Sequence, residues 1–355
     1  MQIALKTVTN SRLSSVDLTN IPFGRIFTDH MFVMEYDGGQ WVNQRIEGIK
    51  TIEVHPANLT LHYGQSIFEG MKASKNPEGV PLLFRPDMHA KRINASAHRM
   101  CMPEVPEDDF VEAVRQLVWL EKDWIPDMEG SALYIRPFMF ATDEFLGVAP
   151  SETYKFIIMT LPVAPYYSHP VSLKASHKFI RAAKGGVGEA KTAGNYAASL
   201  YASKKAKEEG FDQVLWLDGN EFKFAQEVGT MNIFFVIGDK VITPATDGAI
   251  LKGITRDSFL QILRADGVEV EERAIAMDEV VHAYEQGTLR EVFGSGTAAV
   301  AVDVKRIAYR DHEILLDPRP DSLAQRLKEE INGIRTGTKI DRFGWIEPVL
   351  EASNV

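Results

Sequence analysis

The sequence contains a single cysteine, Cys101, among 355 residues. One cysteine can form neither an internal disulfide nor a metal cluster built on thiolates. The nine histidines show no close-paired spacing of the kind that metal ligands have. We therefore expect no bound metal and a reducing, cytoplasmic location.

Long hydrophobic runs and an excess of basic residues are also missing. No apolar stretch approaches the ~18 residues that span a bilayer, and residues 1–10 lack the apolar segment of a signal peptide. The 39 basic residues are outnumbered by 49 acidic ones, which gives a formal net charge of −10. A nucleic-acid surface would need a basic stripe. We therefore expect neither a membrane nor a nucleic acid as a partner.

The composition that remains, 45% hydrophobic and 25% charged, is typical of a soluble globular protein. A chain of 355 residues is long enough for two domains with separate cores. Three prolines between residues 162 and 170 indicate a linker. We expect a smaller α/β domain over residues 1–164, a linker over 165–174 and a larger domain over 175–355.

Both halves of the chain mix strand and helix patterns. Apolar runs predict strands at residues 31–36, 133–140, 155–161, 213–217 and 231–236. Helical spacing, with proline or glycine at some ends, predicts helices at residues 86–100, 108–120, 197–209 and 254–264. Residues 290–293 are expected to enter a turn at Gly-Ser-Gly-Thr, residues 294–297.

Lys191 lies in a turn of small residues, 188–195, that leads into a helix. Most lysines are solvated surface charges. In this turn, however, a planar group has room to approach the amine. A neutral lysine amine condenses with an aldehyde to form a Schiff base, and lysine is the usual anchor of pyridoxal phosphate.

Glu227 precedes an almost wholly apolar strand. A buried carboxylate is costly unless it meets a positive partner, and a protonated pyridine nitrogen would be such a partner. A solvated glutamate at a strand end is the alternative interpretation.

Two further segments have the composition of a phosphate site. Gly253 at a helix start leaves backbone N–H groups available, and Thr255 adds a hydroxyl. The Gly-Ser-Gly-Thr segment allows close backbone approach and offers the hydroxyl of Thr297. Taken singly, the first is also an ordinary helix cap and the second an ordinary turn.

Together, these segments resemble the branched-chain amino acid aminotransferases of the class IV, or fold-type IV, pyridoxal-phosphate family. The resemblance covers roughly residues 20–345 and is carried by residues 62–70, 134–137, 191–196, 213–217, 227–232 and 293–298. It implies a two-domain α/β (α+β) architecture, like that of D-amino acid aminotransferase, with pyridoxal 5'-phosphate in the interdomain cleft.

The resemblance also implies roles for the cofactor contacts. Lys191 would carry the Schiff base and move the substrate α-proton. Glu227 would face the pyridine nitrogen, and Tyr196 would hydrogen-bond the phenolic oxygen. The phosphate would be bound by Arg92, Ile254, Thr255 and Thr297.

Substrate contacts are implied in the same way. The side chains matching an aromatic pocket for a branched aliphatic group are Tyr63, Phe68, Tyr134 and Tyr166. Arg136 would meet the distal carboxylate of glutamate, and Thr230 and Ala298 the α-carboxylate. Family members are homodimers or larger, and residues 145–148, with Leu146 and Val148, match a loop that closes the neighbouring subunit's pocket. The expected partners are leucine, isoleucine, valine, glutamate and their 2-oxo acids.

Three alternatives remain beside this interpretation. D-amino acid aminotransferases and aminodeoxychorismate lyases share the lysine and the glutamate, but residues 134–137 and 227–232 favour the branched-chain enzymes. Residues 185–192 superficially match a nucleotide-binding P-loop, which requires glycine immediately before lysine, whereas Ala190 stands here.

A Cys-x-x-Cys pair found in some family members is replaced by Ala299 and Val302.

Overall fold

The computed structural model describes residues 1–165 and 169–351, so the predicted pocket residue Tyr166 lies outside the described residues. The described chain forms two compact units. Unit 1 is built from residues 1–166, 190–193 and 332–355, and unit 2 from residues 167–189 and 194–331. The predicted domain boundaries at residues 164 and 175 stay predictions beside these units.

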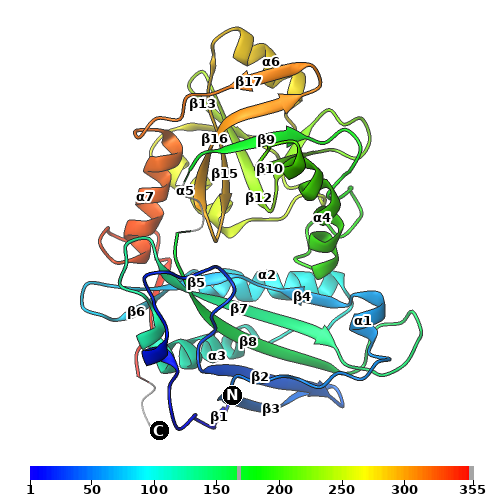
Figure 1. Ribbon diagram of the computed structural model, residues 1–355, viewed down its shortest axis with the longest axis vertical. Helices are drawn as coiled ribbons and strands as arrows, with labels where there is room; N and C mark the ends of the chain where they lie inside the picture. Colours follow the sequence, from blue (N-terminus) through cyan, green and yellow to red (C-terminus); the bar gives the residue numbers. More distant parts are fainter. Residues whose placement is uncertain (166–168, 352–355) are drawn as a thin grey trace. The chain divides into compact units, whose positions relative to one another are not determined.

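Unit 1 contains a nine-stranded sheet (Figure 1). Its main path runs β1-β3-β2-β8-β7-β5-β6-β18, with β4 paired to β7. All pairs are antiparallel except β1 with β3. The strands are β1 (Ala4–Leu5), β2 (His30–Asp37), β3 (Gln40–Gly48), β4 (Ser66–Phe68), β5 (Met71–Lys75), β6 (Pro81–Phe84), β7 (Ala132–Ala141), β8 (Tyr154–Val163) and β18 (Ile346–Pro348).

Two long helices pack against this sheet, α2 (Pro86–Arg99) and α3 (Glu107–Leu120). Proline occupies the first turn of α2, where its missing N–H costs nothing. The apolar face of α3, with Phe110, Val114 and Leu117, lies in one core with residues of β2 and β8. Both helices confirm the sequence prediction. The short helices are η1 (Leu13–Ser15), α1 (Leu59–Tyr63) and η2 (Lys122–Trp124).

Unit 2 contains the second nine-stranded sheet (Figure 1). Because β11 pairs with both β10 and β12, the strands β10, β9, β16, β15, β12 and β11 close into a ring. The strands are β9 (Val171–Ala175), β10 (Gln213–Leu217), β11 (Ala225–Val228), β12 (Met231–Ile237), β13 (Lys240–Thr243), β14 (Glu269–Glu272), β15 (Leu289–Gly296), β16 (Val300–Tyr309) and β17 (His312–Leu315). Strand β9 begins within the segment predicted as a linker, and its Val171 and Leu173 are fully buried.

Three helices lie wholly or almost wholly in unit 2: α4 (Ala193–Glu208), α5 (Ile254–Ala265) and α6 (Met277–Glu285). Helix α7 (Leu323–Arg335) begins in unit 2 and ends in unit 1. The predicted helices at residues 197–209 and 254–264 are confirmed as α4 and α5. The turn predicted at residues 294–297 is wrong by three residues. Strand β15 continues to Gly296 because Gly294 and Gly296 pair with β16, and the turn follows at residues 297–299.

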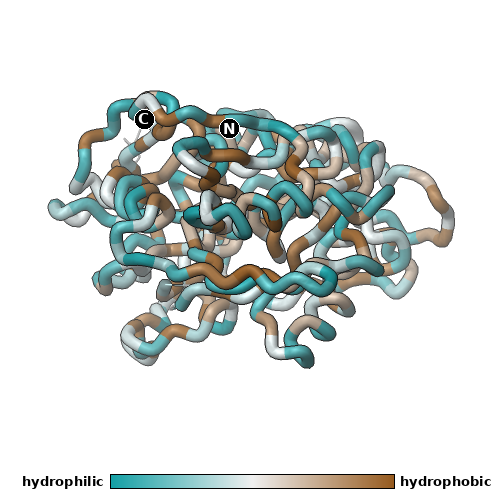
Figure 2. The backbone as a smooth tube through the Cα atoms, turned by 90° about the horizontal axis from the view of Figure 1, so that it is seen from above, coloured by the Kyte–Doolittle hydropathy of each residue, from teal (hydrophilic) through white to brown (hydrophobic). Residues whose placement is uncertain are grey.

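Hydrophobic segments are short and alternate with hydrophilic ones along the backbone (Figure 2). Within residues 1–165 and 169–351, no helix is long and apolar enough to cross a membrane.

Candidate active site

The backbone of Lys191 is held on both sides by unit 1. Its N–H donates to Ser96 Oγ on α2 at 2.9 Å, and its carbonyl accepts from Phe68 N on β4 at 3.0 Å. The next residue, Thr192, donates its hydroxyl to Ser66 O at 2.8 Å. Lys191 therefore has a fixed backbone position and does not lie in a loose loop.

The amine of Lys191 lies against an aromatic ring that a second cation shares. Lys191 Nζ is 4.8 Å from the centroid of the Phe68 ring, and the Arg136 guanidinium carbon is also 4.8 Å from it. Arg136 Nη2 donates to the Tyr134 hydroxyl at 3.0 Å. Arg136 Nε is buried and has no hydrogen-bond partner among the described residues. The structure thus brings together four predicted site residues, Phe68, Tyr134, Arg136 and Lys191.

Arg92 has a partner that the sequence did not predict. Its Nε and Nη2 donate to the two carboxylate oxygens of Glu69, at 2.7 and 2.8 Å. His89 Nδ1 lies 2.7 Å from Glu69 Oε2. Burial alone would raise the pKa of Glu69, but the charge and hydrogen bonds of Arg92, together with the hydrogen bond of His89, hold it well below its ordinary value. Glu69 is therefore ionised, and its charge balances that of Arg92.

Three predicted substrate contacts lie on exposed segments of unit 1. Tyr63, at the end of α1, is 46% exposed, and Leu146 and Val148 in the β7–β8 loop are 68% and 90% exposed. The base of this loop is fixed, since Asp143 accepts hydrogen bonds from Glu152 N and the Thr153 hydroxyl. A rigid base thus presents an apolar tip to solvent.

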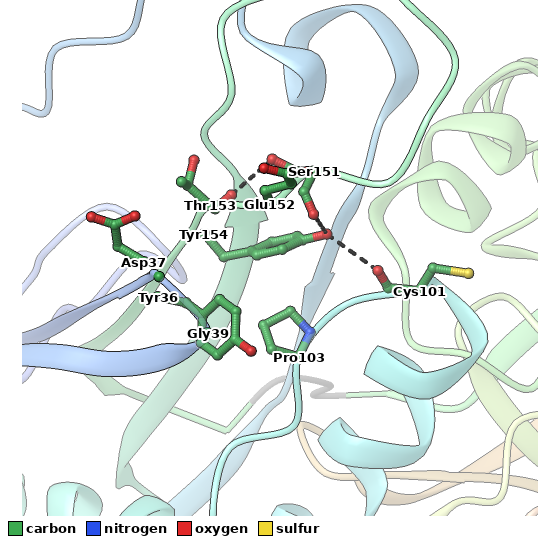
Figure 3. Close-up of a pocket in the computed structure, with 10 residues that line it drawn as sticks. Tyr36, Asp37, Gly39, Cys101, Pro103, Ser151, Glu152, Thr153 and Tyr154 are labelled. Carbon is green, nitrogen blue, oxygen red and sulfur yellow. Dashed lines mark hydrogen bonds between the residues drawn. The ribbon is translucent and has the colours of Figure 1, made fainter.

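A pocket of about 590 Å³ lies next to this loop base (Figure 3). The Tyr154 hydroxyl is within hydrogen-bond distance of the carbonyls of Ser151 and Cys101, at 2.6 and 3.2 Å. Among the described residues, the lining includes Asp37 and Glu152 but no basic side chain. This pocket therefore lacks the positive charge that a phosphate needs.

In unit 2, Glu227 is buried at 3% exposure at the end of β11. Its Oε2 forms an ion pair, rather than an aligned hydrogen bond, with Arg181 Nε. Its Oε1 accepts from Asn232 Nδ2 at 3.3 Å. The sequence-based alternative of a solvated glutamate is wrong. A small pocket beside it is lined by Arg181, Asn195, Tyr196, Ser199, Glu227, Gly229, Thr230 and Leu251. This pocket brings together the predicted residues Tyr196, Glu227 and Thr230.

The predicted phosphate contacts of unit 2 lie at two loop ends. Gly253 is the N-cap of α5 and provides no side-chain cap, so the first N–H groups of the helix have no intrahelical acceptor. Ile254 and Thr255 follow it and are buried. Thr297 and Ala298 are half-buried in the turn after β15.

Asn232 on β12 connects the carboxylate of Glu227 with the segment before α5. Besides Glu227, its amide donates to Leu251 O at 2.9 Å, immediately before the α5 cap. A Cβ on Gly253 would lie 2.0 Å from Asn232 Oδ1. Glycine at this cap therefore lets the side chain of Asn232 reach between Glu227 and α5.

These donor sets fit pyridoxal phosphate. Unit 1 offers an amine on a fixed backbone and a positioned guanidinium. Unit 2 offers an uncapped helix N-terminus with a buried threonine hydroxyl, which suits a phosphate. It also offers a buried carboxylate, which suits a pyridinium.

Sequence reasoning did not find several residues of these sites. Glu69 lies inside the family motif at residues 62–70, but its residue type alone does not indicate a role. Arg181, His89 and Ser96 carried no local signal, because their contacts are to segments distant in the chain. A buried carboxylate in a motif implies a nearby cation, and this rule was the one usable signal for Arg181.

A family model described as amino-transferase class IV matches residues 66–307. Branched-chain-amino-acid aminotransferase 2 of Bacillus subtilis is 46% identical over 347 residues, covering 96% of both chains. A probable branched-chain-amino-acid aminotransferase of Staphylococcus epidermidis is 48% identical over 335 residues, covering 93% of each.

A solved structure shows the same similarity. The branched-chain amino acid aminotransferase of Thermobaculum terrenum, in its PLP (holo) form, aligns at a TM-score of 0.74 and 25% identity. The alignment covers 90% of this chain and 98% of that one.

Proposed function

Because the chain belongs to the class IV aminotransferases, which depend on pyridoxal phosphate, we propose that it is a branched-chain amino acid aminotransferase. It transfers the amino group of leucine, isoleucine or valine to 2-oxoglutarate, reversibly. The observation that carries this proposal is the placement of Lys191. Its backbone is hydrogen-bonded on both sides, and its amine lies over the Phe68 ring.

Each polar group has a distinct task in this proposal. Pyridoxal phosphate, when bound, supplies an aldehyde for the lysine and a ring that accepts electrons. With the cofactor bound, Lys191 Nζ would take the proton from the substrate Cα and carry it between the substrate and the cofactor. Glu227 would hold the proton on the ring nitrogen, and Tyr196 would donate to the phenolic oxygen. Arg92, the N-terminus of α5 and Thr297 would bind the phosphate.

Arg181 adds to the task of Glu227. Its guanidinium pairs with the buried carboxylate and also donates to Gly188 O, at 3.0 Å, and to Ala249 O. A cation beside Glu227 favours the ionised carboxylate. Only the ionised form can accept a hydrogen bond from a pyridinium with both charges balanced.

The substrate side chain is assigned to the aromatic surface of unit 1. Phe68 and Tyr134 present apolar rings suited to a branched aliphatic group. Arg136 lies against both rings, and its Nε has no protein partner among the described residues. A guanidinium in this position serves an apolar substrate as part of the wall and a glutamate substrate as a carboxylate clamp. Thr230 and Ala298 are assigned to the α-carboxylate.

Trapping the cofactor on the protein tests the proposal. Borohydride reduction followed by peptide mapping is expected to find the adduct on Lys191, and Lys191→Ala is expected to abolish transamination while unfolding remains cooperative. An adduct on any other lysine would exclude the mechanism. Assays with L- and D-isomers separate this function from that of a D-amino acid aminotransferase.

Assembly into a homodimer or larger oligomer is part of the proposal, as is a cytoplasmic location for a protein with one cysteine. Its support is a set of exposed apolar side chains on α1 and the β7–β8 loop, namely Leu61, Tyr63, Phe145, Leu146 and Val148. Sedimentation velocity of Val148→Asp against the unaltered protein tests it. An unaltered protein that sediments as a monomer excludes the assembly.

A further inference from the structure

Glu69 has no task in the proposed chemistry, yet its side chain has no solvent exposure. Four donors surround its carboxylate. Two come from Arg92, one is His89 Nδ1, and the fourth is Gly70 N, at 3.1 Å from Oε2. Burying a carboxylate this completely is costly unless every lone pair is used. The arrangement therefore requires a reason beyond a chance surface ion pair.

The geometry of the pair fixes the orientation of Arg92. A guanidinium is planar and carries five N–H groups. Glu69 takes Nε–H and one Nη2–H in a bidentate fork, which leaves the other three directed away from the carboxylate. The carbonyl of Arg92 also accepts from Ser96 Oγ at 3.1 Å, and Ser96 in turn accepts from Lys191 N. Backbone and side chain of Arg92 are thus both held.

We propose that Glu69 is a positioning residue, which holds the guanidinium of Arg92 so that its opposite edge binds the phosphate of the cofactor. The inference rests on the proposed function, because it presupposes a phosphate-bearing ligand. Its physical content is preorganisation. An arginine fixed before the ligand arrives loses less conformational entropy on binding than one that must be ordered by it.

His89 completes the arrangement without adding charge. Burial lowers its pKa, Glu69 opposes this change, and the cations of Arg92 and Lys191 lower it further. Neutral His89 uses Nδ1–H to bind Glu69 and leaves the net charge of the cluster at zero. Glu69 therefore pairs with one cation, Arg92, and not also with a protonated His89.

The test compares two ligands that differ only in the phosphate, pyridoxal phosphate and pyridoxal. Their dissociation constants are measured on the cofactor-free full-length protein by the absorbance of the lysine adduct. We expect Glu69→Gln to raise the dissociation constant of pyridoxal phosphate about 10- to 100-fold, the range for losing a hydrogen bond to a charged group. Pyridoxal binding should stay within about twofold, because it makes no phosphate contact. Equal losses for both ligands would overturn the inference.

The control is another bidentate arginine–carboxylate pair of the same unit. Arg45 Nη1 and Nη2 donate to the carboxylate of Glu35, at 2.9 and 3.0 Å, between β3 and β2. Glu35→Gln removes a similar pair and should leave both dissociation constants unchanged.

A double-variant cycle covers the case in which Glu69→Gln folds poorly with Arg92 left unpaired. If Glu69 acts only through Arg92, then Glu69→Gln/Arg92→Met binds pyridoxal phosphate as Arg92→Met does. A further loss in the double variant would show a structural role for Glu69 and overturn the inference. If Arg92→Met alone binds pyridoxal phosphate with normal affinity, then Arg92 does not bind the phosphate, and the inference is overturned at that step. An adduct absent from Lys191 in the unaltered protein would instead overturn the proposed function.

Discussion

Phe68, Glu69 and Gly70 are three consecutive residues with three different neighbours. The Phe68 ring lies under the Lys191 amine and the Arg136 guanidinium. Glu69 binds Arg92, and Gly70 leaves room for the Tyr134 hydroxyl, which a Cβ would approach to 2.0 Å. A small change at any of these positions therefore affects a different part of the proposed site.

Arg136→Met is expected to separate the two half-reactions of the enzyme. Removing the guanidinium should weaken the glutamate and 2-oxoglutarate half-reaction by roughly 2–5 kcal/mol, the scale for breaking a buried charge pair. The leucine half-reaction should lose much less, because methionine replaces the apolar contact with the aromatic rings. Single-turnover absorbance changes of the cofactor follow each half-reaction separately. Equal losses would mean that Arg136 is structural or binds the α-carboxylate common to both substrates.

Residues named in contiguous motifs could be predicted from the sequence, and their distant partners could not. Lys191 and Glu227 are recognisable because their neighbours in the chain identify them. The ion pair of Arg181 with Glu227 forms between separate segments, so no local sequence pattern predicts it. Tyr63 was predicted in an aromatic pocket, but within this single chain it is 46% exposed. Its role stays a prediction.

At the scale of elements, the N-terminus of α5 depends on a contact outside the helix. The capping position is occupied by glycine, and the space that a side chain would fill contains the amide of Asn232. Sequence periodicity predicted α5 itself to within one residue at its C-terminal end. It could not predict Asn232 at the cap, since this contact joins β12 to a helix about 20 residues further along the chain.

Gly253→Ala is expected to displace Asn232 and loosen the phosphate end of the site. The new Cβ would lie 2.0 Å from Asn232 Oδ1, so the amide must move and lose its bond to Leu251 O. We expect a loss of about 1–3 kcal/mol in the free energy of unfolding, typical of overpacking. Thermal unfolding of the cofactor-free protein measures it. Gly194→Ala is the matched control, because its Cβ meets nothing within 4 Å; equal destabilisation of both variants would refute the contact.

At the scale of the whole molecule, unit 1 is assembled from three stretches of chain. The last stretch returns after unit 2 and adds β18 to β6, with Ile346 opposite Phe84. It also brings Trp345, whose ring is 5.6 Å from that of Phe84 and whose carbonyl accepts from Arg85 N at 2.8 Å. The proline-rich segment predicted a domain boundary at residue 164, and this boundary stays a prediction. Nothing in the sequence pattern indicated this return, because a three-residue strand carries too little periodicity.

Deleting residues 338–355 is expected to destabilise unit 1. The edge of β6 loses its partner strand and Phe84 loses the cover of Trp345, a change on the scale of removing a large buried aromatic side chain. We expect the melting temperature to fall by roughly 10 °C and light scattering to rise on heating. Ile340→Ala, at a side chain that is 87% exposed, is the control within the same segment. A deletion that melts like the unaltered protein would show that β18 contributes little.

The discontinuity of unit 1 also sets an order of events during synthesis on the ribosome. Chains emerge from the N-terminus, and domains generally fold as units once their residues are available. The backbone hydrogen bonds of Lys191 to strand β4 and helix α2 need only residues up to 193, so they can form early. Strand β18 consists of residues 346–348 and is made only after all of unit 2. Strand β6 therefore remains an open edge while all of unit 2 is being translated, and this interval is when the nascent chain is most exposed to wrong strand pairing.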